Sequence, residues 1–128
     1  MITYNFSDYA DYAKVGTDIL FTGISALDCA MSLATQLYDQ HKVVYWWSDT
    51  YRTWAMRVTD DMPLYHFTIR ANELVTYDCV ICNMEDVGDI LDAGYNGVIY
   101  AIVDDMQVLY SEECAPYLQR FYVENSMG

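Results

Sequence analysis

The chain has 128 residues, 54% of them hydrophobic, and its formal net charge is -13 at pH 7. This length predicts a single domain over residues 1–128, and the hydrophobic content excludes a disordered chain. No apolar run approaches the ~20 residues that a membrane helix needs, and the first residues lack the basic and apolar regions of a signal peptide. We therefore expect a cytoplasmic protein.

The net charge comes from 19 acidic residues against six lysines and arginines, and the acids are spread along the whole chain. Direct binding to nucleic acid is not expected, because it requires a basic surface. Two interpretations of the acidity remain. It keeps a very aromatic chain soluble, or it steers the protein onto a basic groove that normally holds DNA or RNA.

Four cysteines are present, and in a cytoplasmic protein they are expected to be reduced. Cys79 and Cys82 form one Cys-x-x-Cys pair, but a zinc site needs further ligands, and His41 and His66 are isolated in the sequence. We expect no metal site, and interpret the cysteines as small buried apolar side chains.

The first quarter of the chain predicts two strands. Residues Ile2 to Phe6 alternate between apolar and polar side chains, and the apolar run Ile19 to Thr22 predicts a second strand that Gly23 breaks. Between them, residues 7–16 fit either a short helix or a turn-rich connection.

A helix is predicted from Ala26 to about Gln40. Ser25 precedes it, and Asp28 follows three positions later with the spacing of a capping box. Apolar residues recur at steps of three and four, which predicts one wide buried face. That face consists of Leu27, Ala30, Met31, Ala34, Leu37 and Tyr38.

The middle of the chain predicts further strands. Val43 to Trp47 and Thr53 to Val58 are strand-like runs joined by a polar turn, and Leu64 to Arg70 alternates as a strand with one solvated face does. Residues 79–82 fit no single backbone state. Residues 117–123 fit either a strand or a helical turn.

A short helix is predicted to begin after Asn83. Asp86 lies three residues on, again at capping-box spacing, and Val87, Ile90 and Leu91 fall on one face. Gly94 is expected in the left-handed conformation that ends a helix.

A β-hairpin is predicted to follow this helix. The apolar run Val98 to Val103 predicts a buried strand, and Gln107 to Tyr110 is close enough to be its hairpin partner. The order of all these elements predicts an α+β fold, with mostly antiparallel sheets and two main helices packed against them.

This order of elements resembles the ADP-ribosyltransferase fold. The likeness rests on Tyr4–Ser7, Ile19–Thr22 and the helix that follows, and on Gly94–Val98 with the acidic turn and last strand after it. It is nearest to the small phage anti-CRISPR ADP-ribosyltransferases, which modify the type I-F surveillance complex. The resemblance implies NAD as cofactor and a mono-ADP-ribosylation that inactivates a host complex targeting nucleic acid.

The resemblance also implies catalytic residues, because ADP-ribosyl transfer passes through an oxocarbenium-like state that a carboxylate stabilises. Asp104 and Asp105 are the candidate carboxylates. Gln107 stands where many members of the family have a glutamate, and Asn5 stands where they have a histidine or arginine. The acidic pair also fits an exposed hairpin turn, where aspartate is common.

NAD would be held by Asn5, Ser7, Tyr38 and Arg70 if the resemblance extends to the cofactor site. Tyr38, or alternatively Tyr95, would stack on the nicotinamide ring, and Arg70 would bind the pyrophosphate. Core positions are the favoured interpretation of the tyrosines, and the arginine also fits an exposed residue that pairs with nearby acids.

A non-enzymatic inhibitor is the alternative hypothesis. Asn5, the missing glutamate and the net charge favour a protein that blocks a basic nucleic-acid-binding groove of a host enzyme. A structural subunit is a third possibility, since Trp46 and Trp47 suit an oligomer interface as well as a core.

Overall fold

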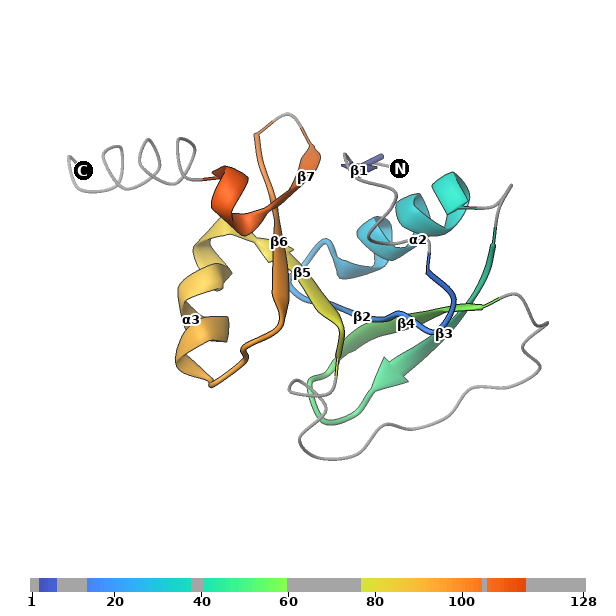
Figure 1. Ribbon diagram of the computed structural model, residues 1–128, viewed down its shortest axis with the longest axis horizontal. Coiled ribbons are helices and arrows are strands. Elements are labelled where there is room, and N and C mark those ends of the chain that lie inside the picture. Colours follow the sequence, from blue (N-terminus) through green and yellow to red (C-terminus); the bar gives the residue numbers. More distant parts are fainter. Residues whose placement is uncertain (1–2, 7–13, 38–40, 60–76, 105, 115–128) are drawn as a thin grey trace.

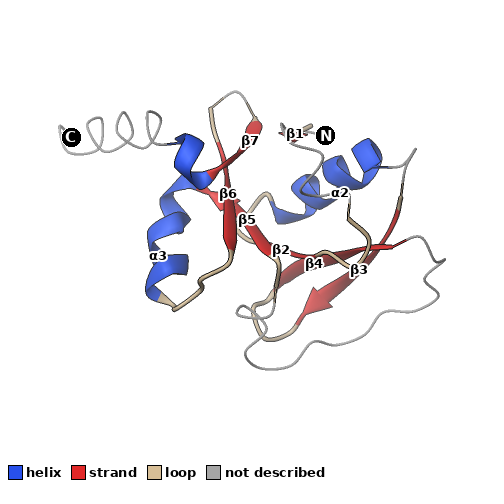
Figure 2. Ribbon diagram, in the orientation of Figure 1, coloured by secondary structure: helices blue, strands red, loops and turns tan. Residues whose placement is uncertain are grey.

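The structure is a computed structural model, and it describes residues 3–6, 14–37, 41–59, 77–104 and 106–114. These residues form one mixed seven-stranded sheet and two α-helices, so the fold is α+β (Figures 1 and 2). No helix in these segments is both long and apolar enough to cross a membrane. The strand predicted over residues 64–70 and the segment 117–123 lie outside the described residues.

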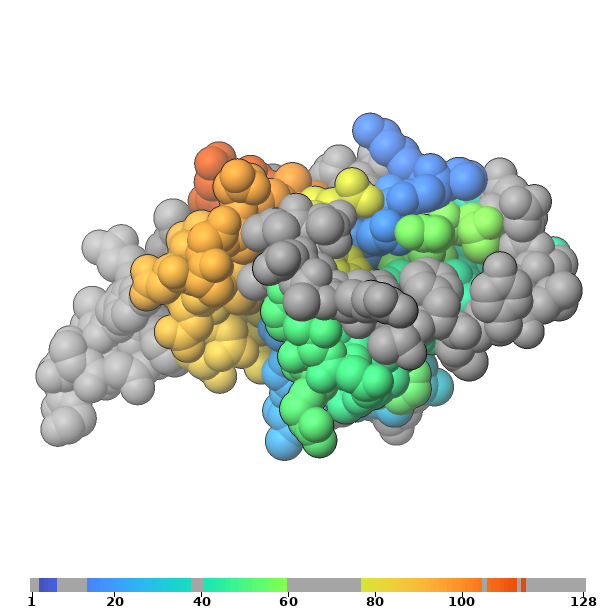
Figure 3. Space-filling model, turned by 90° about the horizontal axis from the view of Figure 1, so that it is seen from below, coloured from blue at the N-terminus to red at the C-terminus, as the bar shows by residue number. Residues whose placement is uncertain are grey.

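The elements follow the chain in nearly the predicted order. They are β1 (Asn5–Phe6), β2 (Asp18–Phe21), α2 (Ala26–Leu37), β3 (Lys42–Ser48), β4 (Thr53–Thr59), β5 (Cys79–Asn83), the 3₁₀ helix η2 (Met84–Asp86), α3 (Val87–Asp92), β6 (Val98–Ile102), β7 (Gln107–Tyr110) and the 3₁₀ helix η3 (Ser111–Cys114). Residues 77–114 gather at one end of the described molecule, coloured yellow to orange in Figure 3.

The strand order in the sheet is β1-β7-β6-β5-β2-β4-β3. The three central strands, β6, β5 and β2, run parallel to one another, and β1 runs parallel to β7. The pairs β2–β4, β3–β4 and β6–β7 are antiparallel. The predicted hairpin of β6 and β7 is therefore confirmed, but the prediction of mostly antiparallel sheets was only partly right.

Strand β5 is the reason for this difference. Its four apolar residues, 79–82, are all buried, so the run shows neither the period of a strand with one wet face nor that of an amphipathic helix. The segment from β5 through η2 and α3 then crosses over to β6, and a crossover of this kind joins parallel strands.

Helix α2 packs on one face of the sheet and also closes one of its edges. Ser32 Oγ accepts a hydrogen bond from the Tyr4 backbone N–H at 3.1 Å. Gln36 accepts from the Phe6 backbone N–H at 3.3 Å and donates to the Tyr4 carbonyl at 2.7 Å. These side chains make hydrogen bonds with the backbone at the edge of the sheet, where a neighbouring strand would otherwise make them. Since α2 also contacts β3 and β4, the sheet curls around it (Figure 1).

The buried face of α2 differs from the predicted one by one position. Leu27 and Met31 are 43% and 39% exposed, whereas Leu33, which the prediction omitted, is completely buried. One residue rotates a helix face by about 100°. The apolar residues buried along α2 are Ala26, Cys29, Ala30, Leu33 and Leu37.

The short helix after β5 begins differently from the prediction. The Asn83 side chain makes no capping hydrogen bond, and a 3₁₀ turn precedes α3, so the capping box was wrong. Leu91 is 55% exposed while Ile90 is buried, so the predicted apolar face holds only in part. Gly94 has φ +93°, which confirms the predicted left-handed helix end.

Candidate functional site

Three of the predicted catalytic and cofactor-binding residues lie near one another. Asn5 and Gln107 are register partners in the β1–β7 pair, and the Asn5 backbone N–H donates to the Met106 carbonyl at 2.8 Å. Asp104 lies in the preceding turn and is exposed. Ser7, Tyr38, Arg70 and Asp105 lie outside the described residues.

Tyr95, the alternative candidate for stacking on nicotinamide, lies elsewhere and is buried. Its hydroxyl donates to the carbonyls of Tyr77 and Val98, each 3.2 Å away, and burial raises the pKa of this phenol. Gly97 permits this position, because a Cβ there would collide with the Tyr95 hydroxyl. Tyr95 is 3% exposed and packs in a buried cluster, so it occupies a core position, as the alternative interpretation of the tyrosines expects.

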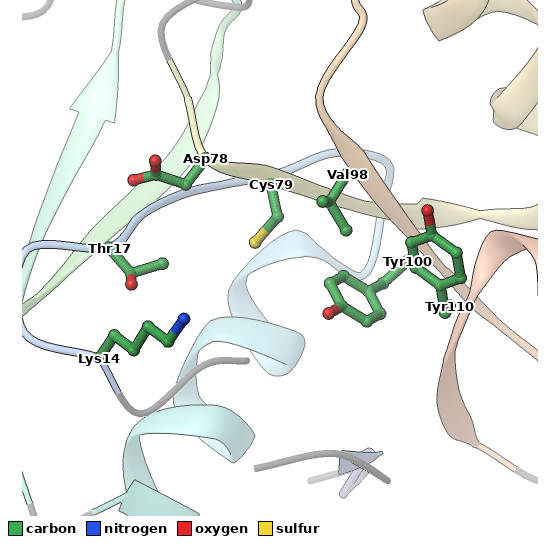
Figure 4. Close-up of a pocket in the computed structure, with 7 residues that line it drawn as sticks. All are labelled: Lys14, Thr17, Asp78, Cys79, Val98, Tyr100 and Tyr110. Atoms are coloured by element: carbon green, nitrogen blue, oxygen red, sulfur yellow. The ribbon is translucent and has the colours of Figure 1, made fainter. Parts of the chain in front are cut away.

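One cavity, of about 270 Å³, opens at the amino ends of the parallel strands (Figure 4). In Figure 4 the Lys14 amine and the Tyr100 hydroxyl extend toward the same space, and the Cys79 thiol points into it. Of the predicted site residues, the three that the structure describes, Asn5, Asp104 and Gln107, do not line this cavity. It is lined by Lys14, Thr17, Asp78, Cys79, Val98, Tyr100 and Tyr110.

The carboxyl ends of β2 and β5 form a topological switch point. These strands are parallel neighbours, but β2 leads into α2 and β5 leads into η2 and α3. Phe21 of β2 packs in the cluster that α2 covers, whereas Leu20 packs in the cluster of Ile90 on α3. The two helices therefore lie on opposite faces of the sheet (Figure 1). Open sheets bind their ligands in the crevice that such a divergence creates.

A second cavity, of about 310 Å³, lies at this switch point. Its walls combine apolar side chains with two carboxylates and the Tyr51 side chain from the β3–β4 turn. The Thr22 hydroxyl oxygen is buried and has no hydrogen-bond partner among the described residues. The residues that line the cavity are Leu20, Thr22, Tyr51, Asp86, Asp89, Ile90 and Ala93.

Asp86 is the most perturbed carboxyl group of this switch-point cavity. Desolvation raises its pKa above the ordinary value of 3.8, and the negative charges of Glu85 and Asp89 raise it further. A hydrogen bond with the Asn83 side chain partly opposes this rise. Within the described segments neither Asp86 nor Asp89 forms an ion pair. The cavity thus holds negative charge that no described cation balances.

We expect Asp86→Asn to stabilise the free protein slightly at about pH 7. A carboxyl whose folded pKa is raised opposes folding above that pKa, and the penalty disappears as pH falls below the unfolded value of 3.8. The increase in melting temperature should be small, about 1–3 °C, because the carboxylate is largely screened by solvent. It should vanish at about pH 3.

Thermal unfolding followed by circular dichroism at the two pH values measures this effect. Asp92→Asn is the matched control, because it removes the same charge from an exposed position on α3. An equal gain from both substitutions at neutral pH would mean that general charge repulsion, and not the position of Asp86, sets the effect.

None of the four cysteines forms a disulfide, and all four are buried. Burial raises the pKa of Cys29 and of Cys82 to about 12, so both are protonated thiols at neutral pH. Among the described residues, no three His, Cys, Asp or Glu side chains are grouped as metal ligands would be. None of the four cysteines is among the described residues that line the switch-point cavity.

No protein-family model matches the chain, and comparison with curated proteins and with solved structures returned no significant match. The resemblance to ADP-ribosyltransferases therefore stays a prediction.

Proposed function

We propose that this protein is a non-catalytic inhibitor that covers a basic nucleic-acid-binding surface of a host enzyme in the cytoplasm. The observation that carries the proposal is the division of charge along the chain. No Lys, Arg or His occurs between Arg70 and Arg120, while acids continue throughout that stretch. The exposed acids within described residues 77–114 are Asp78, Glu85, Asp89, Asp92, Asp104 and Glu112.

Packing brings most of these acids to one side of the sheet. Met84 of η2 and Cys114 of η3 meet in one buried cluster with Ala101 and Val103, so η2, α3 and η3 cover the same face. We call this the acidic face, and define it by Glu85, Asp86, Asp89, Asp92 and Glu112.

The described basic residues lie in the other half of the chain. They are Lys14, His41, Lys42, Arg52 and Arg57, all before residue 60. Arg57 pairs with Asp18 at 2.6 Å. No described ion pair joins these basic residues to the acidic face. A surface with unpaired negative charge attracts a partner of opposite charge over long distances.

The test is competition with DNA for a captured partner. The immobilised full chain is incubated with host lysate depleted of nucleic acid, and retained proteins are identified and purified. We expect them to bind nucleic acid and to be displaced by duplex DNA. Binding should weaken steeply with salt, because the screening length falls from about 10 Å at 0.1 M to about 3 Å at 1 M. Retention that neither salt nor DNA reduces would overturn the proposal.

Charge variants locate the binding surface. Glu85→Gln with Asp92→Asn removes two charges from the acidic face and should weaken the captured complex by about fivefold to tenfold. Asp28→Asn with Asp49→Asn removes two charges from the other half of the chain and serves as the matched control. Equal losses would show that net charge alone acts, and would contradict a role for the acidic face.

NAD-dependent mono-ADP-ribosylation is a second candidate. The proximity of Asn5, Gln107 and the Asp104 turn favours it, because the family resemblance implies these three positions as site residues. Calorimetric titration with NAD, followed by an assay of nicotinamide release in host lysate, tests it. Activity that Asp104→Ala with Asp105→Ala abolishes would establish the enzyme. Absence of both binding and release would exclude it.

A further inference from the structure

We propose that the switch-point cavity receives an arginine side chain of the basic protein partner. This inference rests on the proposed function and assigns the anchor of that interface. The cavity brings together three features: apolar walls, two carboxylates without described ion pairs, and the Thr22 hydroxyl without a described hydrogen-bond partner. Each of them corresponds to one part of an arginine side chain.

The volume of the cavity restricts its occupant. About 310 Å³ lies at the lower end of the roughly 300–1,000 Å³ that small-ligand pockets span. A dinucleotide would fill a pocket near the upper end of that range, whereas a single long side chain or a small amine suits this one. The acidic lining excludes phosphates and carboxylates, since two like charges already lie at the site.

The apolar walls suit the stem of a long cationic side chain. Leu20 and Ile90 are buried, and with Ala93 they present hydrocarbon on either side of the crevice. Lysine and arginine bury their methylene stems along such surfaces while the charged group reaches a polar partner. Tyr51 adds an aromatic ring, which attracts a guanidinium over its face.

The carboxylates select guanidinium over ammonium. Asp86 and Asp89 are three residues apart at the start of α3, which places their side chains next to each other. A guanidinium offers five N–H donors in a planar fork, enough for both carboxylates and for the Thr22 oxygen, whereas an ammonium offers three donors from one point. Buried arginine anchors are also among the residues that dominate binding energy at protein interfaces.

Ethylguanidinium chloride is the probe that tests the cavity without the partner. In a nuclear magnetic resonance titration of the full chain, we expect saturable shifts of the Thr22, Ile90 and Ala93 amides with a roughly millimolar dissociation constant. n-Propylammonium should bind at least about threefold more weakly. Shifts that do not saturate, or equal binding of the two cations, would overturn the assignment of an arginine.

Two isosteric double variants separate the cavity from the rest of the acidic face. Asp86→Asn with Asp89→Asn should weaken probe binding at least about tenfold, while Glu85→Gln with Asp92→Asn should change it less than about twofold. Ala93→Leu fills the cavity, keeps every charge, and should abolish binding as well. Melting temperatures and amide spectra verify that each variant is folded. Equal effects of the two double variants on probe binding would show that the cavity is not the binding site of the probe.

The captured partner distinguishes failure of this inference from failure of the proposed function. The acidic face could bind the partner while the Asp86 and Asp89 variant weakens that complex no more than the Glu85 and Asp92 variant does. The assignment of the cavity as an arginine site would then be wrong, and the proposed inhibitor function would be unaffected. If the chain retains no nucleic-acid-binding partner but still binds ethylguanidinium at the cavity, the cavity is a guanidinium site and the proposed inhibitor function is wrong.

Discussion

Gly23→Ala is expected to destabilise the protein by about 2–4 kcal/mol, a large part of the 5–15 kcal/mol that holds a domain folded. Gly23 has φ +90°, and an alanine in the left-handed region costs about 1–2 kcal/mol. Its Cβ would also lie 2.6 Å from Asn83 Nδ2, so Asn83 must move. That movement removes the hydrogen bond to Asp86 and alters the switch-point cavity. Urea unfolding measures the stability, and ethylguanidinium titration measures the cavity.

Gly94→Ala is the matched control for Gly23→Ala. Gly94 has nearly the same backbone angle, φ +93°, but a Cβ there would meet no atom within 4 Å. It should lose only the backbone contribution, about 1–2 kcal/mol, and should leave the cavity unchanged. Adding Asn83→Ala to Gly23→Ala should recover part of the loss by removing the collision. If the two glycine variants lose equal stability, the Asn83 side chain can move away from residue 23 without loss of stability. The contact between them would then not fix the shape of the switch-point cavity.

Local sequence patterns predicted those features that depend only on residues close together in the chain. The left-handed helix end at Gly94, the strand break at Gly23 and the hairpin of β6 and β7 all follow from turn chemistry and short-range spacing. The position of Gly23 beside Asn83 cannot be predicted in this way, because the two residues are 60 positions apart and meet only when β2 and β5 pair.

The switch-point cavity was missed for the same reason. From the sequence, Asp86 is expected in a capping box at a helix start and Thr22 at the end of a strand, while Asp89 is given no role. Only the assignment of residues 79–83 as a parallel strand beside β2 brings these residues together. A buried central strand has no wet face, so its apolar run carries no period that distinguishes strand from helix. The uncharged run of residues 79–82, between Asp78 and the predicted helix start at Asn83, was the signal in the sequence that could have indicated a buried strand.

The proximity of Asn5 and Gln107 was predicted from the order of the elements, through the family resemblance. The family resemblance placed both residues at one site, and the β1–β7 pairing makes them neighbours. Tyr38, the tyrosine assigned with them, lies outside the described residues. Tyr95, the other candidate, is held in the core by the hydrogen bonds of its hydroxyl, and Gly97 leaves room for it there. With thirteen tyrosines in the chain, the sequence offers no basis for choosing which one faces a cleft.

Leu33→Ala should lower the free energy of unfolding by about 3–5 kcal/mol. Leu33 is completely buried between α2 and the curled sheet, in a cluster with Ile19, Phe21 and Ile81. Truncation of such a leucine loses its transfer free energy and leaves a cavity, because the surrounding strands relax only partly. Urea unfolding should show a lower midpoint with an unchanged slope, which marks a change in stability and not in the unfolded surface.

Leu27→Ala removes the same atoms from the same helix and decides which face of α2 meets the sheet. Leu27 is 43% exposed, so its truncation should cost less than about 1 kcal/mol. The apolar spacing of the sequence alone favours the opposite result, because it places Leu27 on the buried face and omits Leu33. A larger loss for Leu27→Ala than for Leu33→Ala would mean that α2 is rotated by one residue, and Ser32 and Gln36 would then no longer reach the edge of β1.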